Sequence, residues 1–247
     1  MGPVRIYPFG ILVVAGIVTG VCMLRARAAR RGLDPDIALG LGVSAVLCGL
    51  AGSHLMRLLF FEPNLLRNPA VIFDFKLGGM YSFGGLVVGA AAAWIYCRGL
   101  KLDAAKTWAY FDLLAFVFPF GWVFGRAGCS VAHDHPGIRA YNWLSVDFPG
   151  GPRYDLGLLE FFFILPVIAW FLWLDRRPRP GGFYLAVGLI VSGTFRFCLD
   201  GLHEPGVPRF ILTPDQTWGL IAAVAGAVVL ANVLRRPAPG RTPTAVP

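Results

Sequence analysis

His133, Asp134 and His135 form the most unusual short segment of the chain, because three consecutive side chains can exchange protons or bind metal ions. An imidazole is the natural base near neutral pH, and a neighbouring carboxylate can orient it. Pro136 and Gly137 follow, so the segment is also typical of a turn. A metal ion is less favoured, because no further ligands are spaced around it. We therefore expect a base, preferably His133, and no metal.

Two arginines near the ends of apolar runs are the next candidates. Arg126 precedes the histidine segment and Arg196 follows later in the chain. A guanidinium group stays charged and presents paired donors that match phosphate oxygens. The alternative is an arginine that snorkels or pairs with an acid, since a charge at the bilayer centre costs about 2.5 to 3.5 kcal/mol. Both arginines are therefore candidates to bind a phosphate group or to pair with an acid.

The acids near these arginines suggest supporting roles. Asp155 and Glu160 are five residues apart and would point to different faces of a helix. Glu160 lies one turn into an apolar run, so it is expected to pair with Arg126 or Arg196 more than to act as an acid or base. Asp200 and Glu204, four apart, could share a helix face and form an ion-pair cluster near Arg196.

The chain that positions these side chains is apolar: 56% of its 247 residues are hydrophobic, 15% are charged and the mean hydropathy is +0.64. A soluble core of this size could not hide so many apolar side chains, so a bilayer is the solvent that fits. A helix needs roughly 20 mainly apolar residues to cross it. We predict an all-α, polytopic membrane protein with about seven transmembrane helices, at residues 8–24, 37–60, 83–96, 108–124, 156–174, 183–199 and 218–234.

The chain carries no linker or change of composition that would divide these stretches. We expect one transmembrane domain over residues 1–236 and a disordered, Pro- and Thr-rich cytoplasmic tail at 237–247. The third stretch is short and is preceded by paired glycines, which indicates a broken or re-entrant start. The first stretch lacks a small-residue cleavage motif and is expected to be a retained span.

The basic residues predict the orientation. Of 22 lysines and arginines, 13 follow the first, third, fifth and seventh stretches. By the positive-inside rule the N-terminus lies outside and the C-terminus is cytoplasmic, which gathers the candidate site residues on the non-cytoplasmic side. The residues counted are Arg25, Arg27, Arg30, Arg31, Arg98, Lys101, Lys106, Arg176, Arg177, Arg179, Arg235, Arg236 and Arg241.

The net charge of +8 is explained by the same topology, because the basic residues cluster between apolar runs instead of along one polar face. No nucleic acid is expected as a partner. The five cysteines form no CxxC pair and mostly lie inside apolar runs, where a thiol behaves as a small hydrophobic group. Neither disulfides nor a zinc site are expected.

Several short motifs follow one another in a fixed order. They are RIYPFG at 5–10, RRGL at 30–33, GGMYSFGG at 78–85, GRAG at 125–128, FRF at 195–197, HEP at 203–205 and TPDQ at 213–216. In order and spacing, over most of the chain, they resemble the bacterial prolipoprotein diacylglyceryl transferase family. That family moves a diacylglyceryl group from phosphatidylglycerol to the cysteine thiol of a lipoprotein precursor.

The resemblance implies an enzyme of the bacterial inner membrane with its active site toward the periplasm and no cofactor. Its partners would be phosphatidylglycerol, membrane lipid and the signal-peptide segment of a prolipoprotein, with glycerol phosphate released. Tyr81 could bond the lipid phosphate or serve as an ordinary interfacial anchor. The expected catalytic residues are His133, His135, Arg126 and Arg196. The expected substrate-binding residues are Arg126, Arg196, Tyr81, Ser82, Gly84, Gly85, Asp134, Arg153, Asp155 and Glu160.

The chain departs from the family pattern at four positions. Phe83 stands where family members usually have histidine, Cys129 and Ala132 replace asparagines of the GRxG signature, and Ser192 replaces a tyrosine. The 133–135 segment would then replace the missing histidine as the base. Two alternatives follow: a related lipid transferase with a different acceptor, and a phospholipid-binding membrane protein without catalysis.

Overall fold

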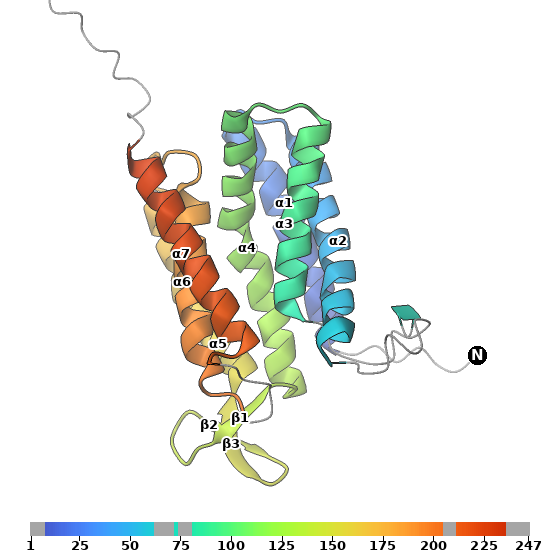
Figure 1. Cartoon of the computed structure of the whole chain (residues 1–247), viewed down its shortest axis with the longest axis vertical. Helices are drawn as coiled ribbons and strands as arrows, with labels where there is room; N and C mark the ends of the chain where they lie inside the picture. Colours follow the sequence, from blue (N-terminus) through green and yellow to red (C-terminus); the bar gives the residue numbers. More distant parts are fainter. Residues whose placement is uncertain (1–7, 62–71, 74–80, 205–210, 236–247) are drawn as a thin grey trace, which may run out of the picture. The chain divides into compact units, whose positions relative to one another are not determined.

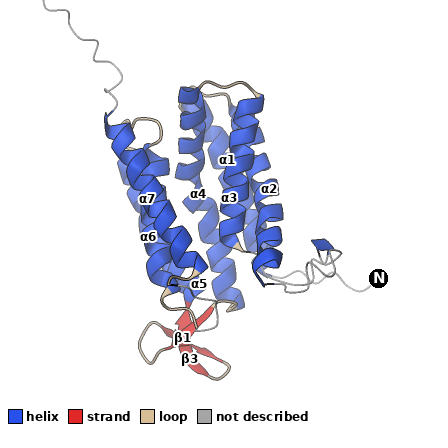
Figure 2. Ribbon diagram, viewed as in Figure 1, coloured by secondary structure: helices blue, strands red, loops and turns tan. Residues whose placement is uncertain are grey.

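The computed structural model describes residues 8–61, 72–73, 81–204 and 211–235. Parts of the sequence predictions fall outside these ranges. They are residues 5–7 of the first motif, residues 78–80 of the glycine motif with part of the expected broken entrance, Pro205 of the HEP motif, and the disordered tail at 237–247. Within the described residues the chain forms seven helices and three short strands (Figures 1 and 2). The predicted helical class is confirmed.

Each predicted apolar stretch lies in a helix. Six of the described helices, all except α3, are long and apolar enough to cross a membrane, so the chain is a multi-pass membrane protein. The 18-residue α3 corresponds to the stretch that the sequence predicted to be short. The helices are α1 Pro8–Arg30, α2 Pro35–Phe61, α3 Ser82–Gly99, α4 Ala104–Ala132, α5 Leu156–Leu174, α6 Phe183–Asp200 and α7 Pro214–Arg235.

Several helices extend past their apolar stretches, and α4 does so with the largest consequence. The sequence predicted its end near residue 124, but it continues to Ala132. Arg126 therefore lies inside α4, about two turns before its end. The helix can continue because arginine and alanine are good helix formers and because the Arg126 charge is neutralised by an acid from another helix.

A three-stranded antiparallel sheet forms in the connection between α4 and α5, to which the sequence analysis assigned no secondary structure. Strands β1 Pro136–Arg139, β2 Ser145–Phe148 and β3 Gly151–Asp155 pair in the order β1-β3-β2. The turn between β2 and β3 is possible because Gly150 and Gly151 adopt positive φ angles of 95° and 113°. β3 continues directly into α5.

The chain forms two compact units, residues 1–20 with 111–247 and residues 21–110. In the second unit α2 packs closely on α3, and a Cβ atom added at Gly49 would lie 3.0 Å from the carbonyl oxygen of Gly85. In the first unit α6 packs on α7, and a Cβ atom at Gly219 would lie 2.7 Å from the Gly193 carbonyl oxygen. Such small residues let membrane helices approach closely. That residues 1–236 form one transmembrane domain stays a prediction.

Aromatic side chains join α4, α5 and α6, the helices that carry the charged residues of the site. Phe116 meets the edge of Tyr184 with ring centroids 4.9 Å apart, and Phe171 lies 5.4 Å from Tyr184. All three rings are buried, and such pairs contribute about 0.5 to 1.5 kcal/mol each beyond their burial. This packing fixes the three helices against one another.

The TPDQ motif is a capping box that begins α7. The Thr213 hydroxyl accepts a hydrogen bond from the Gln216 N–H at 3.0 Å, and the Gln216 side chain accepts one from the Thr213 N–H at 3.2 Å. The buried Thr213 hydroxyl also donates to Asp200, the last residue of α6. The start of α7 is thus bonded to the end of α6.

Candidate active site

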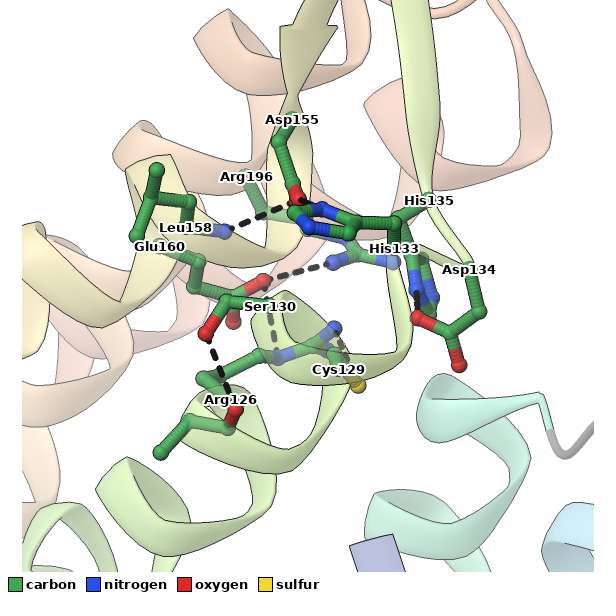
Figure 3. A network of polar contacts seen from close by, with 11 residues as sticks. Arg126, Cys129, Ser130, His133, Asp134, His135, Asp155, Leu158, Glu160 and Arg196 are labelled. Carbon is green, nitrogen blue, oxygen red and sulfur yellow. Dashed lines mark hydrogen bonds and ion pairs between the residues drawn. The ribbon is translucent and has the colours of Figure 1, made fainter. Parts of the chain in front are cut away.

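Glu160 of α5 binds two arginines from two other helices (Figure 3). Its Oε2 lies 3.0 Å from Arg126 Nε of α4 and 3.2 Å from Arg196 Nη1 of α6. Its Oε1 accepts a 2.9 Å hydrogen bond from the indole of Trp122. The prediction that Glu160 pairs with Arg126 or Arg196 is confirmed, and it pairs with both.

The arginines differ in exposure. The side chain of Arg126 is 5% exposed and its guanidinium group lies 4.8 Å from the Trp122 ring centroid, whereas the side chain of Arg196 is 26% exposed. Arg196 also faces Asp215 of α7 at 3.5 Å, which is longer than its contact with Glu160. With Asp215 counted, two arginines and two carboxylates make this group formally neutral. The longer contact, at the more exposed arginine, is the one that an incoming anion can replace most readily.

His133 and Asp155 form a second polar pair in the same unit. His133 follows the last residue of α4 with a positive φ of 49°, and its Nδ1 lies 2.7 Å from Asp155 Oδ2. The other oxygen of the fully buried Asp155 accepts a 3.0 Å bond from the Leu158 N–H and so caps α5. Because a carboxylate only accepts, neutral His133 donates through Nδ1 and keeps Nε2 free of a proton. The half-exposed imidazole can therefore accept a proton from a substrate.

His135 makes a separate pair with its neighbour. Its Nδ1 lies 2.5 Å from Asp134 Oδ1. The Cys129 thiol lies close by, and Arg126 Nη1 is 3.9 Å from its sulfur. One ligand atom each from Cys129, Asp134 and His135 fall within 4.8 Å of one another. Sequence reasoning missed Cys129 because it was taken as an apolar residue, although its place three residues after Arg126 puts both on one helix face.

Arg153 of β3 stabilises the sheet against the end of α6. It pairs with Glu204 and donates to the Gly137 carbonyl oxygen at 3.3 Å, while Gly137 forms a bridge with His203. Glu204 therefore binds Arg153, where the sequence predicted a cluster around Arg196. Asp200 contacts His203 at 3.3 Å and the Thr213 hydroxyl.

Tyr81, Ser82, Gly84 and Gly85 belong to the other unit, at the start of α3. The Tyr81 N–H donates to the Ser53 carbonyl oxygen at 3.1 Å. A Cβ atom at Gly84 would lie 2.8 Å from the Gly52 carbonyl oxygen, and one at Gly85 3.1 Å from that of Gly49. These glycines thus serve the packing of α2 on α3, and a role of this segment in substrate binding stays a prediction.

The fold and the polar clusters define a class: a multi-pass helical membrane protein with a buried Arg–Glu–Arg cluster and a histidine–aspartate pair. The family model described as prolipoprotein diacylglyceryl transferase matches residues 1–232, and the chain belongs to that family. The resemblance seen in the motifs is thereby confirmed.

Curated relatives carry the name phosphatidylglycerol–prolipoprotein diacylglyceryl transferase. One from Chromohalobacter salexigens is 31% identical over 233 residues, which cover 90% of this chain and 80% of the relative. One from Leifsonia xyli is 30% identical over 92% of this chain and 75% of the relative. One from Clostridium tetani is 23% identical over 91% and 92%.

Proposed function

We propose that the protein transfers the diacylglyceryl group of phosphatidylglycerol to the cysteine thiol of a prolipoprotein and releases glycerol phosphate. The observation that carries this proposal is the Arg126–Glu160–Arg196 cluster, in which the more exposed Arg196 can exchange its 3.5 Å contact with Asp215 for a phosphate. Family membership and the names of the relatives support the substrates.

The arginines hold the phosphate that becomes the leaving group. A lipid phosphate first reaches Arg196, the more exposed cation, and exchanges with the 3.5 Å contact to Asp215. Arg126 contributes a second positive charge to the same site, where the shared Glu160 carboxylate holds it. As the carbon–oxygen bond to the phosphate breaks, the leaving group gains a negative charge, and fixed cations stabilise that charge without reorganising.

The acceptor thiol needs a base, and His133 supplies it. Its Nε2 takes the thiol proton, while Asp155 holds the ring and stabilises the imidazolium ion that forms. The thiolate sulfur then attacks the glyceryl carbon, a carbon–sulfur bond forms and glycerol phosphate leaves. His135 and Asp134 lie at the edge of this site and contact the acceptor.

The site faces the periplasm in the proposed arrangement, with the chain in the bacterial inner membrane and the C-terminus in the cytoplasm. A topology reporter fused after Arg236 is therefore expected to stay cytoplasmic, because 13 of 22 basic residues lie on that side. A second reporter, inserted between Gly150 and Gly151, is expected to be exported, since this turn between β2 and β3 interrupts no strand. A cytoplasmic signal from the second fusion would contradict the predicted orientation of the chain in the membrane.

The Arg126→Lys variant is expected to lower the rate of transfer roughly 10- to 100-fold although the charge is kept. Lysine replaces the planar guanidinium group and its paired donors by a single ammonium group, so at least one hydrogen bond is lost. A lost hydrogen bond to a charged group costs about 1.5 to 3 kcal/mol. The measurement is turnover of purified protein, with expression and melting compared to wild type. An unchanged rate would show that Arg126 only anchors the helix.

Release of labelled headgroup from phosphatidylglycerol, with a prolipoprotein peptide as acceptor, tests the proposal directly. Release that needs the peptide thiol supports it, and complementation of a strain depleted of its own transferase extends it to the cell. Release without a thioether on the peptide would favour a different acceptor. Binding of phosphatidylglycerol with no release would favour a protein that binds lipid without catalysis.

A further inference from the structure

Cys129, Asp134 and His135 bring three different metal-binding groups to one place beside the arginine cluster. Their ligand atoms lie within 4.8 Å of one another, although the residues belong to the last turn of α4 and to the segment after it. We propose that these three side chains bind a divalent transition metal ion, with zinc as the best match.

The donor set favours zinc. A thiolate, an imidazole and a carboxylate are the three ligand types that zinc takes, at about 2.3, 2.0 and 2.0 Å respectively. In a tetrahedron these bond lengths place ligand atoms roughly 3.2 to 3.8 Å apart. The three ligand atoms lie within 4.8 Å of one another, and His135 Nδ1 and Asp134 Oδ1, now 2.5 Å apart, would separate as the metal replaces the proton between them.

The site is open on one side. The Cys129 thiol is buried, while the side chains of Asp134 and His135 are 44% and 34% exposed. The positive φ of His133 turns the chain at the end of α4 and directs the next two residues back toward Cys129. Three protein ligands with an exposed side leave a fourth coordination position, which is the pattern of catalytic and not of structural zinc sites.

The charges are compatible with a metal next to an arginine. Zinc bound by a thiolate and a carboxylate carries no net charge, so Arg126 at 3.9 Å from the sulfur faces a neutral group. The form of Cys129 that binds metal is the thiolate, so metal binding displaces the proton of the thiol. Arg126, one of the two arginines of the cluster, thus lies directly beside the metal position.

The role of the metal rests on the proposed function. An acceptor thiol in the fourth position would be held as a thiolate, because a coordinating thiol loses its proton, here to His133. The sulfur then attacks the glyceryl carbon, the carbon–oxygen bond to phosphate breaks, and the thioether leaves the metal as glycerol phosphate is released.

Metal binding is tested on the purified full chain in detergent with Co²⁺ alone and with Zn²⁺ alone. We expect one equivalent of Co²⁺ to give a thiolate-to-metal charge-transfer band that one equivalent of Zn²⁺ removes. Cys129→Ala should abolish the band. Asp134→Asn or His135→Ala should weaken Zn²⁺ affinity more than about 10-fold, because loss of a residue that only hydrogen-bonds a metal ligand already costs at least that much. Cys198→Ala and Asp147→Asn are the matched controls and should bind as wild type.

Separate outcomes bear on the metal and on the transfer reaction. A wild-type protein without the charge-transfer band, or a band that survives Cys129→Ala, overturns the metal site. Stoichiometric metal with no transfer keeps the site and overturns the proposed function. Full transfer after removal of metal by a chelator overturns the role of the metal and leaves the proposed function intact.

Discussion

Replacing His133 by alanine is expected to lower the rate of diacylglyceryl transfer by about 100-fold or more, with phosphatidylglycerol binding unchanged. A positioned general base contributes about 10²- to 10⁴-fold, and Asp155 at 2.7 Å fixes this imidazole with Nε2 as the acceptor. The measurement is headgroup release against lipid concentration, in which kcat should fall while KM stays close to wild type.

A second variant, Asp155→Asn, separates the effect of misorienting the His133 ring from the effect of removing it. The new side chain still caps α5, because asparagine is as good an N-cap as aspartate. Its amide would favour the opposite His133 tautomer, so transfer should fall with little change in stability. If His133→Ala and His135→Ala both retain the wild-type rate, the segment is a turn and the base lies elsewhere.

Replacing Glu160 by glutamine is expected to destabilise the protein by about 3 to 5 kcal/mol, the usual cost of breaking a buried ion pair by removing one partner. The amide oxygen can still accept from Trp122, but the carboxylate that binds Arg126 and Arg196 is lost. The two neighbouring guanidinium groups then repel each other. The free energy of unfolding in detergent, followed by denaturant titration, measures the change.

Asp36→Asn is the matched control, because Asp36 also pairs with an arginine, Arg25, but the two side chains are 78% and 57% exposed. Exposed ion pairs contribute about 0 to 1 kcal/mol, so this variant should be nearly neutral. Adding Arg196→Gln to Glu160→Gln should recover part of the lost stability, since one of the two repelling charges is removed. A Glu160→Gln variant as stable as the control would mean that other acids neutralise both arginines.

Hydropathy predicted the helices well because the bilayer imposes one requirement on every span. The helix ends were not predictable in the same way. Whether α4 continues past residue 124 depends on how the Arg126 charge is neutralised, and its partner Glu160 comes from a different helix. The pairing of Glu160 with an arginine could be predicted from sequence, because a carboxylate inside an apolar run requires a partner.

The sheet and Cys129 show why the rest of the site was not predicted. The strands have only four or five residues each, too few for alternation to stand out, and they are stabilised by pairing and by contacts with the end of α6. Cys129 looks apolar by type and by neighbours, and it becomes a candidate ligand only because His133 reverses the chain. Both features depend on contacts between segments.

Asp155 has a consequence for how the protein can change over generations. Stability and activity are often in conflict, because a side chain positioned for catalysis usually lowers the stability of the folded state. Here one oxygen of a single carboxylate begins α5 and the other orients His133. Aspartate therefore meets both demands at once: selection for stability alone should accept aspartate or asparagine at this position, whereas selection for activity should keep only aspartate.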